Sequence, residues 1–361
     1  MSDLRYWVGF NLVPQIGSAR TALLLDYFGD LEMAWKASAA SLRAAGLPQA
    51  AVERLLYYRA RLDLEAEMAR LEAAGVRAIT WESADYPELL RNIEHPPPVL
   101  YVRGSLLAAD KWAVAVVGTR HVTAYGREVT TRLAKGLAEA GVTVVSGLAL
   151  GVDGIAHQAA LEAGGRTIAV LACGLDRVYP ERHTELARRI EKAGALISDY
   201  PLGTRPDASN FPPRNRIISG LALGTLVTEA GRDSGALITL RYALEQGRET
   251  FAVPGNVYSR TSEGTNGCIQ RGEAKLVLTV QDILEELNLS MAVQHQEVRE
   301  LVPENDTEKA LVACLGPEPT HIDEVVRQSG LATAVVSSTL AMLELKGLVR
   351  RVENMCYVLA Q

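Results

Sequence analysis

The chain has 361 residues, a formal net charge of −6 and an apolar share of 48%, so it is long enough for two or three globular domains. No apolar run reaches the roughly 18 residues that a membrane span needs, and the N-terminus lacks a signal-peptide pattern. We therefore expect a cytoplasmic protein without membrane contact. The overall acidity excludes a protein that coats nucleic acid by bulk charge.

The four cysteines lie far apart, with neither the paired spacing of a metal site nor a dense disulfide framework. We expect ordinary thiols in a reducing compartment and no bound metal. The charge is uneven along the chain. Residues 101–288 carry 21 basic and 20 acidic side chains, whereas residues 1–100 carry 10 and 13 and residues 289–361 carry 6 and 10. A site for a polyanion should therefore be a local patch in the middle segment.

Residues 1–98 are predicted to form a small helical domain, similar to sterile alpha motif (SAM) or helix-hairpin-helix modules. Turns at Val13–Ser18 and Ala45–Pro48 each lead into an amphipathic helix. Glycine at such turns can present backbone N–H groups to phosphate. Because this segment is acidic and Gly17 is a lone glycine, we favour a bundle that only packs on its neighbour. The proline-rich break at His95–Pro98 marks its end.

Residues 99–288 alternate short β-branched runs with helical stretches, near 126–140 and 153–163 among others. This alternation predicts an α/β fold, a Rossmann-like doubly wound parallel sheet covered on both faces. Ligands of such sheets bind beyond the carboxyl ends of the strands. The predicted strands are Ala113–Val117, Val142–Val145, Thr167–Leu171, Ala195–Ser198, Gly224–Thr228 and Thr250–Val253.

The first strand leads into a loop that contains Gly118, Thr119 and Arg120. Gly118 allows a sharp turn, Thr119 faces the start of the next helix, and Arg120 can reach an anion held there. The loop is not G-x-G-x-x-G, which disfavours a dinucleotide, and we expect no cofactor.

The second strand ends at Ser146 and Gly147, which leave room for close approach of a ligand to the backbone. Asp153 is expected to cap the following helix. His157, alone on that helix, is interpreted as a structural histidine rather than an acid–base catalyst.

A later loop, Phe211-Pro-Pro-Arg-Asn-Arg, combines an aromatic ring with two arginines at the start of an apolar helix. Arg214 and Arg216 can grip phosphate through their planar guanidinium groups, and Phe211 offers a face on which an unpaired base can stack. The alternative is an arginine pair that ties the helix start to nearby carboxylates, with Phe211 in the core.

After the fifth strand, Ser234 and Gly235 start another helix and provide a further set of free N–H donors. Several helix starts on one face, joined by three arginines, suit several phosphates better than one. We infer a polyphosphate chain, of which single-stranded nucleic acid is the commonest.

Residues 289–304 are predicted to be a linker, and 305–361 a winged-helix domain with helices near 306–315, 321–328 and 334–346 and a two-stranded wing. The third helix is nearly devoid of positive charge. We therefore favour a structural or protein-binding use over the reading of DNA bases.

The ordered motifs GTR-x-x-T-x-YG, VVSGLA-x-G-x-D-x-x-AH, CGLD-x-x-YP, FP-x-RNRIISGL, SG-x-LIT and AVPG make the chain resemble the DNA-processing protein A family (DprA, also called Smf). The resemblance covers about residues 100–280, and both ends are similar to the longer family members.

The resemblance implies a DNA-binding protein, not an enzyme, that protects incoming single-stranded DNA during natural transformation and loads the RecA recombinase onto it. It also implies displacement of single-strand-binding protein and a homodimer formed through the Rossmann-like domain. The DNA-contacting residues it implies are Arg120, Phe211, Arg214, Asn215 and Arg216, near the Gly118–Thr119, Ser146–Gly147 and Ser234–Gly235 turns.

One departure from the family concerns the positions before Phe211, where many members place a basic residue and this chain has Asp207. One phosphate contact is then missing, or Arg205 replaces it.

The main alternative function is an enzyme, a nucleoside-monophosphate phosphoribohydrolase of the lysine-decarboxylase-like type. Those proteins carry P-G-G-x-G-T-x-x-E, whereas the corresponding turn here begins at Glu229 and lacks the glycine pair and the trailing glutamate. Asp153 and Glu229 are candidate carboxylates, but roles as a helix cap and an ion-pair partner are preferred. A third possibility is an adaptor that recruits a partner through its terminal domains.

Overall fold

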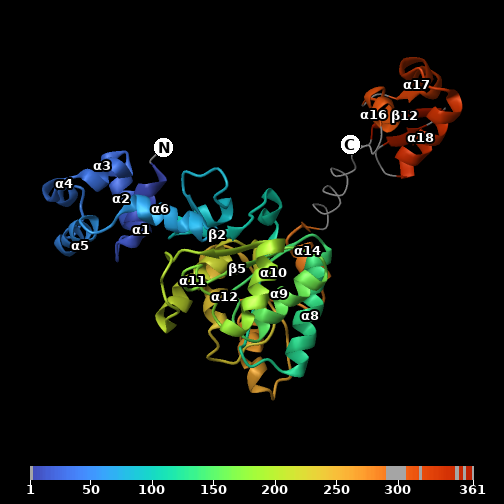
Figure 1. The fold of residues 1–361 in the computed structure, drawn as a ribbon. Helices are drawn as coiled ribbons and strands as arrows, with labels where there is room; N and C mark the ends of the chain where they lie inside the picture. The colour runs from blue at the N-terminus through green and yellow to red at the C-terminus, as the bar shows by residue number, and fades with distance from the viewer. Residues whose placement is uncertain (1–2, 290–305, 317–318, 346–348, 353–354, 360–361) are drawn as a thin grey trace. The chain divides into compact units, whose positions relative to one another are not determined.

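The structure, a computed structural model, describes residues 3–289, 306–316, 319–345, 349–352 and 355–359. The chain forms two compact units, Met1–Leu287 and Asn288–Gln361, and Figure 1 shows the elements of each. Among the described residues, no helix is both long and apolar enough to cross a bilayer.

The first unit begins with a run of helices whose starts are set by short polar side chains. The carboxylate of Asp3 accepts a hydrogen bond from the N–H of Arg5, and Asp30, Ser38 and Asp63 cap later helices in the same way. The helices are α1 (Leu4–Leu12), α2 (Ser18–Phe28), α3 (Leu31–Lys36), α4 (Ala39–Ala44), α5 (Gln49–Arg59) and α6 (Leu64–Ala73).

A nine-stranded sheet follows, in the spatial order β1-β2-β6-β5-β4-β3-β7-β8-β9. Its strands are β1 (Arg77–Thr80), β2 (Val99–Gly104), β3 (Ala113–Val117), β4 (Thr143–Ser146), β5 (Thr167–Val170), β6 (Ala195–Ser198), β7 (Gly224–Val227), β8 (Glu249–Ala252) and β9 (Lys275–Leu276).

Seven neighbouring strands, β6-β5-β4-β3-β7-β8-β9 in their spatial order, pair in parallel. The prediction of a Rossmann-like doubly wound sheet is therefore confirmed. The strand order reverses between β3 and β7, which makes the carboxyl ends of these strands the expected place for a ligand. The sequence analysis missed β1, β2 and β9. The first two extend the sheet with antiparallel pairing beyond β6.

Helices cover both faces of the sheet. Successive side chains of a strand point to opposite faces, and each face has a hydrophobic core that its helices bury. Leu196 packs with α10 and the N-terminal helices, whereas its neighbour Ile197 packs with α11 and α12. Figure 1 shows α8, α9 and α10 side by side. The helices of this part are α7 (Glu88–Arg91), α8 (Ala124–Glu139), α9 (Val152–Glu162), α10 (Thr184–Ala193), α11 (Phe211–Gly220), α12 (Ala236–Glu245), α13 (Glu263–Gln270) and α14 (Val280–Glu286).

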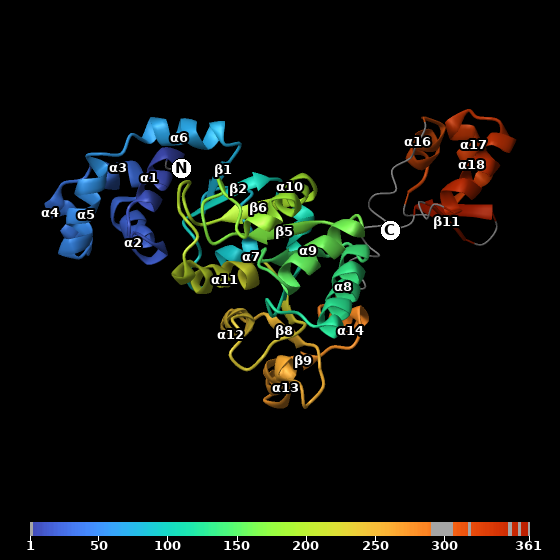
Figure 2. The same cartoon turned by 60° about the horizontal axis from the view of Figure 1, so that its bottom comes forward.

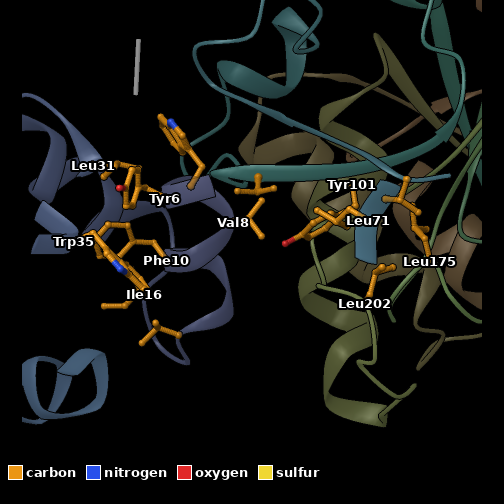
Figure 3. Packing of buried hydrophobic residues seen from close by; sticks show 14 of the residues in the cluster. Tyr6, Val8, Phe10, Ile16, Leu31, Trp35, Leu71, Tyr101, Leu175 and Leu202 are labelled. Carbon is orange, nitrogen blue, oxygen red and sulfur yellow. The ribbon is translucent and has the colours of Figure 1, made fainter. Parts of the chain in front are cut away.

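One hydrophobic core joins the N-terminal helices to the sheet. Figure 3 shows Phe10 and Trp35 packed together among these helices, and Leu71 of α6 beside Tyr101 of β2. The hydroxyl of Tyr101 also donates a hydrogen bond of 2.8 Å to the side chain of Asn11. The helices therefore pack on the sheet as one body, in agreement with the favoured interpretation of this segment. The domain boundary at residue 98 stays a prediction, and β1 lies on its N-terminal side.

The second unit has its own small core around Leu311, Val325, Leu340 and Tyr357. It contains the three predicted helices, and the predicted two-stranded wing gains a short third strand, β10. The predicted linker, apart from Leu289, lies outside the described residues. The elements are α16 (Asp306–Ala313), β10 (Thr320–His321), α17 (Ile322–Ser329), α18 (Thr333–Leu345), β11 (Val349–Val352) and β12 (Cys356–Leu359).

Candidate functional site

A cavity of about 910 Å³ opens at the carboxyl ends of β3 and β7, where the strand order reverses. Its walls are the loop after β3, the loop after β7, the first turn of α11 and the start of α12. The site was expected at this edge because the carboxyl ends of parallel strands meet there.

Eight of the eleven predicted DNA-binding residues line this one cavity. They are Gly118, Thr119, Arg120, Phe211, Arg214, Asn215, Ser234 and Gly235. The other three, Ser146, Gly147 and Arg216, are not among the lining residues.

Phe211 stands in the cavity wall, half-buried and flanked by cations. The guanidinium carbon of Arg120 lies 5.3 Å from the centre of its ring, and that of Arg214 lies 5.8 Å away. The ring of Tyr179, 47% exposed, is tilted against it with 5.8 Å between the ring centres. Two aromatic rings and the exposed Arg120 guanidinium at one wall form a surface on which a flat, electron-rich group can stack.

Arg214 is part of the cavity floor and only 3% exposed. Its Nη1 donates to the carbonyl oxygens of Gly147, at 2.9 Å, and of Val170. These carbonyls follow β4 and end β5, so the guanidinium ties two strand ends to α11. Arg214 was predicted to grip phosphate; as placed, its guanidinium binds internal carbonyl oxygens, and the phosphate contact stays a prediction.

Gly147 and Asp153 complete the environment of Arg214. A Cβ atom on Gly147 would lie 2.6 Å from Nη2 of Arg214 and 2.8 Å from Oδ2 of Asp153, so only glycine fits between them. The Asp153 carboxylate accepts hydrogen bonds from the N–H groups of Gly147 and Ala149, which corrects its expected role as the cap of α9. Burial raises the pKa of Asp153 and lowers that of Arg214, and each charge opposes the shift of the other.

Ser146 and Arg216 are also engaged inside the protein. The Ser146 hydroxyl, fully buried, donates to the carbonyl oxygen of Val116 at 2.6 Å. Arg216 forms a 2.7 Å ion pair with Asp199, and both side chains are largely buried. The alternative considered for the arginine pair, a tie to nearby carboxylates with Phe211 in the core, describes Arg216, whereas Arg214 binds carbonyl oxygens and Phe211 lines the cavity. Ser146, Gly147 and Arg216 do not line this cavity as placed, and their predicted contacts with a ligand stay predictions.

Arg120, in contrast, is exposed at the rim of the cavity. Its loop is held by a 2.7 Å hydrogen bond from the N–H of Thr119 to the carbonyl oxygen of Glu229. Gly151, with φ of +77°, lets the start of α9 pass this loop, since a Cβ there would lie 2.3 Å from the carbonyl oxygen of Thr119. A flexible side chain thus extends from a fixed backbone.

Two further arginines, Arg232 and Arg260, line the cavity and were missed from the sequence. Both are exposed, and like Arg120 they form no ion pair or hydrogen bond within the part of the chain that the structure describes. Arg232 lies two residues before Ser234, in the loop after the fifth predicted strand, so its position could have indicated it. Arg260 follows β8 in the loop that the AVPG motif opens, but it lies five residues beyond that motif, and only the fold brings it to this edge.

Four carboxylates also line the cavity: the buried Asp153 and the exposed Asp207, Asp233 and Glu263. Asp207 begins a short turn, where it accepts hydrogen bonds from the N–H and hydroxyl of Ser209, and these lower its pKa. It is therefore ionised at neutral pH. The cavity lining thus carries both positive and negative side chains and no uniformly positive surface. An anion would be bound at the individual guanidinium groups.

His157 lies away from the cavity lining and is fully buried. The Thr167 hydroxyl donates to the carbonyl oxygen of Val144, so Nδ1–H of His157 donates to the Thr167 oxygen at 2.7 Å. Burial, with the charges of His183 and Arg214, lowers the pKa of His157 to about 3. These contacts agree with its interpretation as a structural histidine.

The lowered pKa of His157 should make the free energy of unfolding depend on pH. Its folded-state pKa of about 3 lies below the ordinary 6.5, so its contribution to stability is complete above pH 6.5 and is lost as pH falls toward 3. The loss is of order 4 kcal/mol across that range. His157→Asn keeps an N–H donor for Thr167 but cannot be protonated. The free energy of unfolding, measured by denaturant titration between pH 7 and pH 4, should fall less steeply with acid in this variant. Equal slopes in both proteins would contradict the assignment.

Comparison with known proteins gives family matches for both units. Residues 77–288 match the sequence model of a family described as DNA recombination-mediator protein A, and residues 295–355 match the DprA winged helix domain. Protein Smf of Synechocystis sp. is 34% identical, and the alignment covers 99% of this chain and 98% of that protein.

Two solved structures are similar in fold and sequence. The X-ray structure of DNA processing protein A from Streptococcus pneumoniae is matched over 79% of this chain and 99% of that one, with a TM-score of 0.69 and 33% identity. DNA processing protein A from Helicobacter pylori, reported to have a unique single-stranded DNA binding mode, is matched over 59% of this chain and 97% of that one, with a TM-score of 0.54 and 31% identity.

Proposed function

The chain belongs to the DNA recombination-mediator protein A family, and from this membership we propose that it binds single-stranded DNA in the cavity between β3 and β7. The observation that carries the proposal is the group of three unpaired guanidiniums, Arg120, Arg232 and Arg260, around a cavity that also presents Phe211. Guanidinium forks bind phosphate oxygens, and an aromatic face accepts an unpaired base of any sequence.

The preference for a single strand follows from Phe211. Its ring is half-buried in the wall between Arg120 and Arg214, so a base must leave its stack and turn into the cavity to meet it. A duplex offers its bases only at the groove edges, and opening it costs unpairing energy. In this arrangement Arg214 and Arg216 build the site, while the three rim arginines hold the strand.

We further propose that the bound strand is protected from nucleases and passed to the RecA recombinase, with displacement of single-strand-binding protein, during transformation or recombination. A homodimer formed through the Rossmann-like unit and a cytoplasmic location belong to the same proposal. Their support is the resemblance to the DprA family over both units.

The alternative, a hydrolase of nucleoside monophosphates, would need a free carboxylate at the cavity. Both oxygens of Glu229 accept hydrogen bonds from Thr123, one from its N–H and one from its hydroxyl, and Glu229 is 2% exposed. Asp153 is held by two N–H groups beside Arg214. The two carboxylates that the sequence analysis considered for this chemistry are therefore engaged in structural contacts, which supports binding without cleavage by Glu229 or Asp153. Release of free base from AMP by the purified protein would favour the enzyme instead.

The test is a gel shift with a labelled oligonucleotide, single-stranded or duplex, with and without purified recombinase. We expect a shifted band with the single strand, a much weaker one with the duplex, and a slower ternary band when recombinase is added. Equal binding of both forms would overturn the proposed preference. Binding of the single strand without a ternary band would leave the site intact and remove the recombinase step.

Removal of the Asp207 charge is expected to strengthen the binding of single-stranded DNA. Asp207→Asn removes a negative charge from the cavity lining but keeps an acceptor for the N–H of Ser209. Single-stranded DNA should bind up to about fivefold more tightly at low salt, and the gain should shrink as salt screens the charge. Fluorescence anisotropy at two salt concentrations measures this. Asp26→Asn, an exposed position on α2, is the matched control, and an equal gain there would show a nonspecific charge effect.

A further inference from the structure

We propose that a bound strand continues out of the cavity over the loop that follows β8, where Tyr258 stacks on a further base and Arg260 holds the phosphate between the two sites. This inference rests on the proposed binding of single-stranded DNA. It assigns to the loop a second stacking position outside the cavity described above.

The cavity is open toward this loop. A neighbouring groove of about 460 Å³ shares Arg232 and Glu263 with the cavity, and Val257 lines it. Arg260, three residues later, lines the main cavity. Residues 257–260 therefore run along the place where the two depressions meet. A chain longer than the cavity would leave it beside Tyr258.

Tyr258 has the exposure of a ligand-binding side chain rather than of a core residue. It is 94% exposed and Val257 is 76% exposed, while the backbone that carries them is fixed. The side chain of Asn256 accepts the N–H of Tyr258 at 2.9 Å, and its carbonyl oxygen accepts the N–H of Ser259 at 2.9 Å. A ring held in water by an ordered backbone can stack on a base without first leaving another partner.

The unpaired positive charges near the loop that follows β8 favour nucleic acid as its ligand. Arg232 and Arg260 have no ion-pair partner among the described residues, whereas the nearby Arg271 is paired with Glu273 at 2.7 Å. The exposed apolar side chains here are Val257 and Tyr258, too few for the core of a protein interface that buries about 1,000 Å² or more. An exposed aromatic ring two residues from the unpaired Arg260, on the loop beside Arg232 and Glu263, matches the alternation of base and phosphate along a single strand.

The experiment compares oligo-dT of about 6 nucleotides, near the lower end of single-strand site sizes, with oligo-dT of about 20, which is long enough to extend beyond the cavity. Tyr258→Ala should weaken binding of the long oligonucleotide roughly 5- to 100-fold and leave binding of the short one unchanged. Tyr258→Phe keeps the ring and should bind both as the unchanged protein does. Tyr27→Ala, a 53% exposed tyrosine on α2, is the matched control and should change neither.

The outcomes separate this inference from the proposed function. If Tyr258→Ala binds the long oligonucleotide normally, or weakens both lengths equally, the continued path is wrong. The cavity is then still tested by Arg120→Ala, which should weaken both lengths. If the unchanged protein binds neither oligonucleotide, the proposed function itself fails. Thermal melting of Tyr258→Ala should match that of the unchanged protein, since its side chain is almost entirely in solvent.

Discussion

Arg214→Ala is expected to lower the free energy of unfolding by about 3–5 kcal/mol, enough to leave much of the protein unfolded at 37 °C. The substitution leaves the buried Asp153 carboxylate without its cation and removes the donor of two strand-end carbonyls, those of Gly147 and Val170. Denaturant titration monitored by circular dichroism measures the loss. A loss of DNA binding in this variant would therefore report on the fold and not on a phosphate contact.

A double substitution distinguishes the buried charge from lost packing. Asp153→Asn removes the uncompensated charge, so adding it to Arg214→Met should restore part of the stability that Arg214→Met alone loses. If the two losses simply add, Asp153 and Arg214 do not depend on each other. In that case the Arg214 guanidinium does not compensate the buried Asp153 carboxylate.

Replacement of Arg120, Arg232 and Arg260 together by glutamine should nearly abolish binding of single-stranded DNA. Each lost phosphate contact lowers the slope of log K against log salt by about 0.7, so the three should lower it by about 2 and weaken binding about a hundredfold near 0.1 M salt. Because all three side chains are exposed and unpaired within the described residues, stability should not change. Anisotropy titrations over a range of salt give the slope.

The control for this variant makes the same change in net charge elsewhere. Lys135, Arg188 and Lys192 are exposed on α8 and α10, and none of them lines the cavity. Their replacement by glutamine should leave the salt slope within experimental error of the unchanged protein. A slope lowered equally by both triple variants would mean that the strand is attracted by general charge and not by the cavity.

The fold was largely predictable because buried parallel strands leave a strong signal. Continuous β-branched runs identified the central strands to within about one residue, and the rule for carboxyl ends then placed the loops of Gly118, Phe211 and Ser234 together. Strands β1 and β2 were missed because they are antiparallel additions at the edge, and one of them lies in a segment dominated by helices.

The roles of the arginines could not be predicted in the same way. A guanidinium in a loop has the same local sequence whether it ties strand ends together, as Arg214 does, or extends into solvent, as Arg260 does. Burial depends on which carbonyls and carboxylates the fold brings near, and those of Gly147, Asp153 and Val170 are distant in sequence. Phe211 lies in the cavity wall, but the exposed arginines of that cavity come partly from other loops.

The shared core of the N-terminal helices and the sheet has a mechanical consequence. Leu71 of α6 belongs to the same cluster as Leu202, which begins the segment that carries Asp207 and leads to Phe211 (Figure 3). Figure 2 shows α6 and β1 at one end of this unit and α13 and β9 at the other, so only one side of the cavity is braced in this way. The N-terminal helices therefore support the cavity wall that carries Phe211. The opposite side of the cavity, near Tyr258, contributes no residue to this hydrophobic cluster among the described residues.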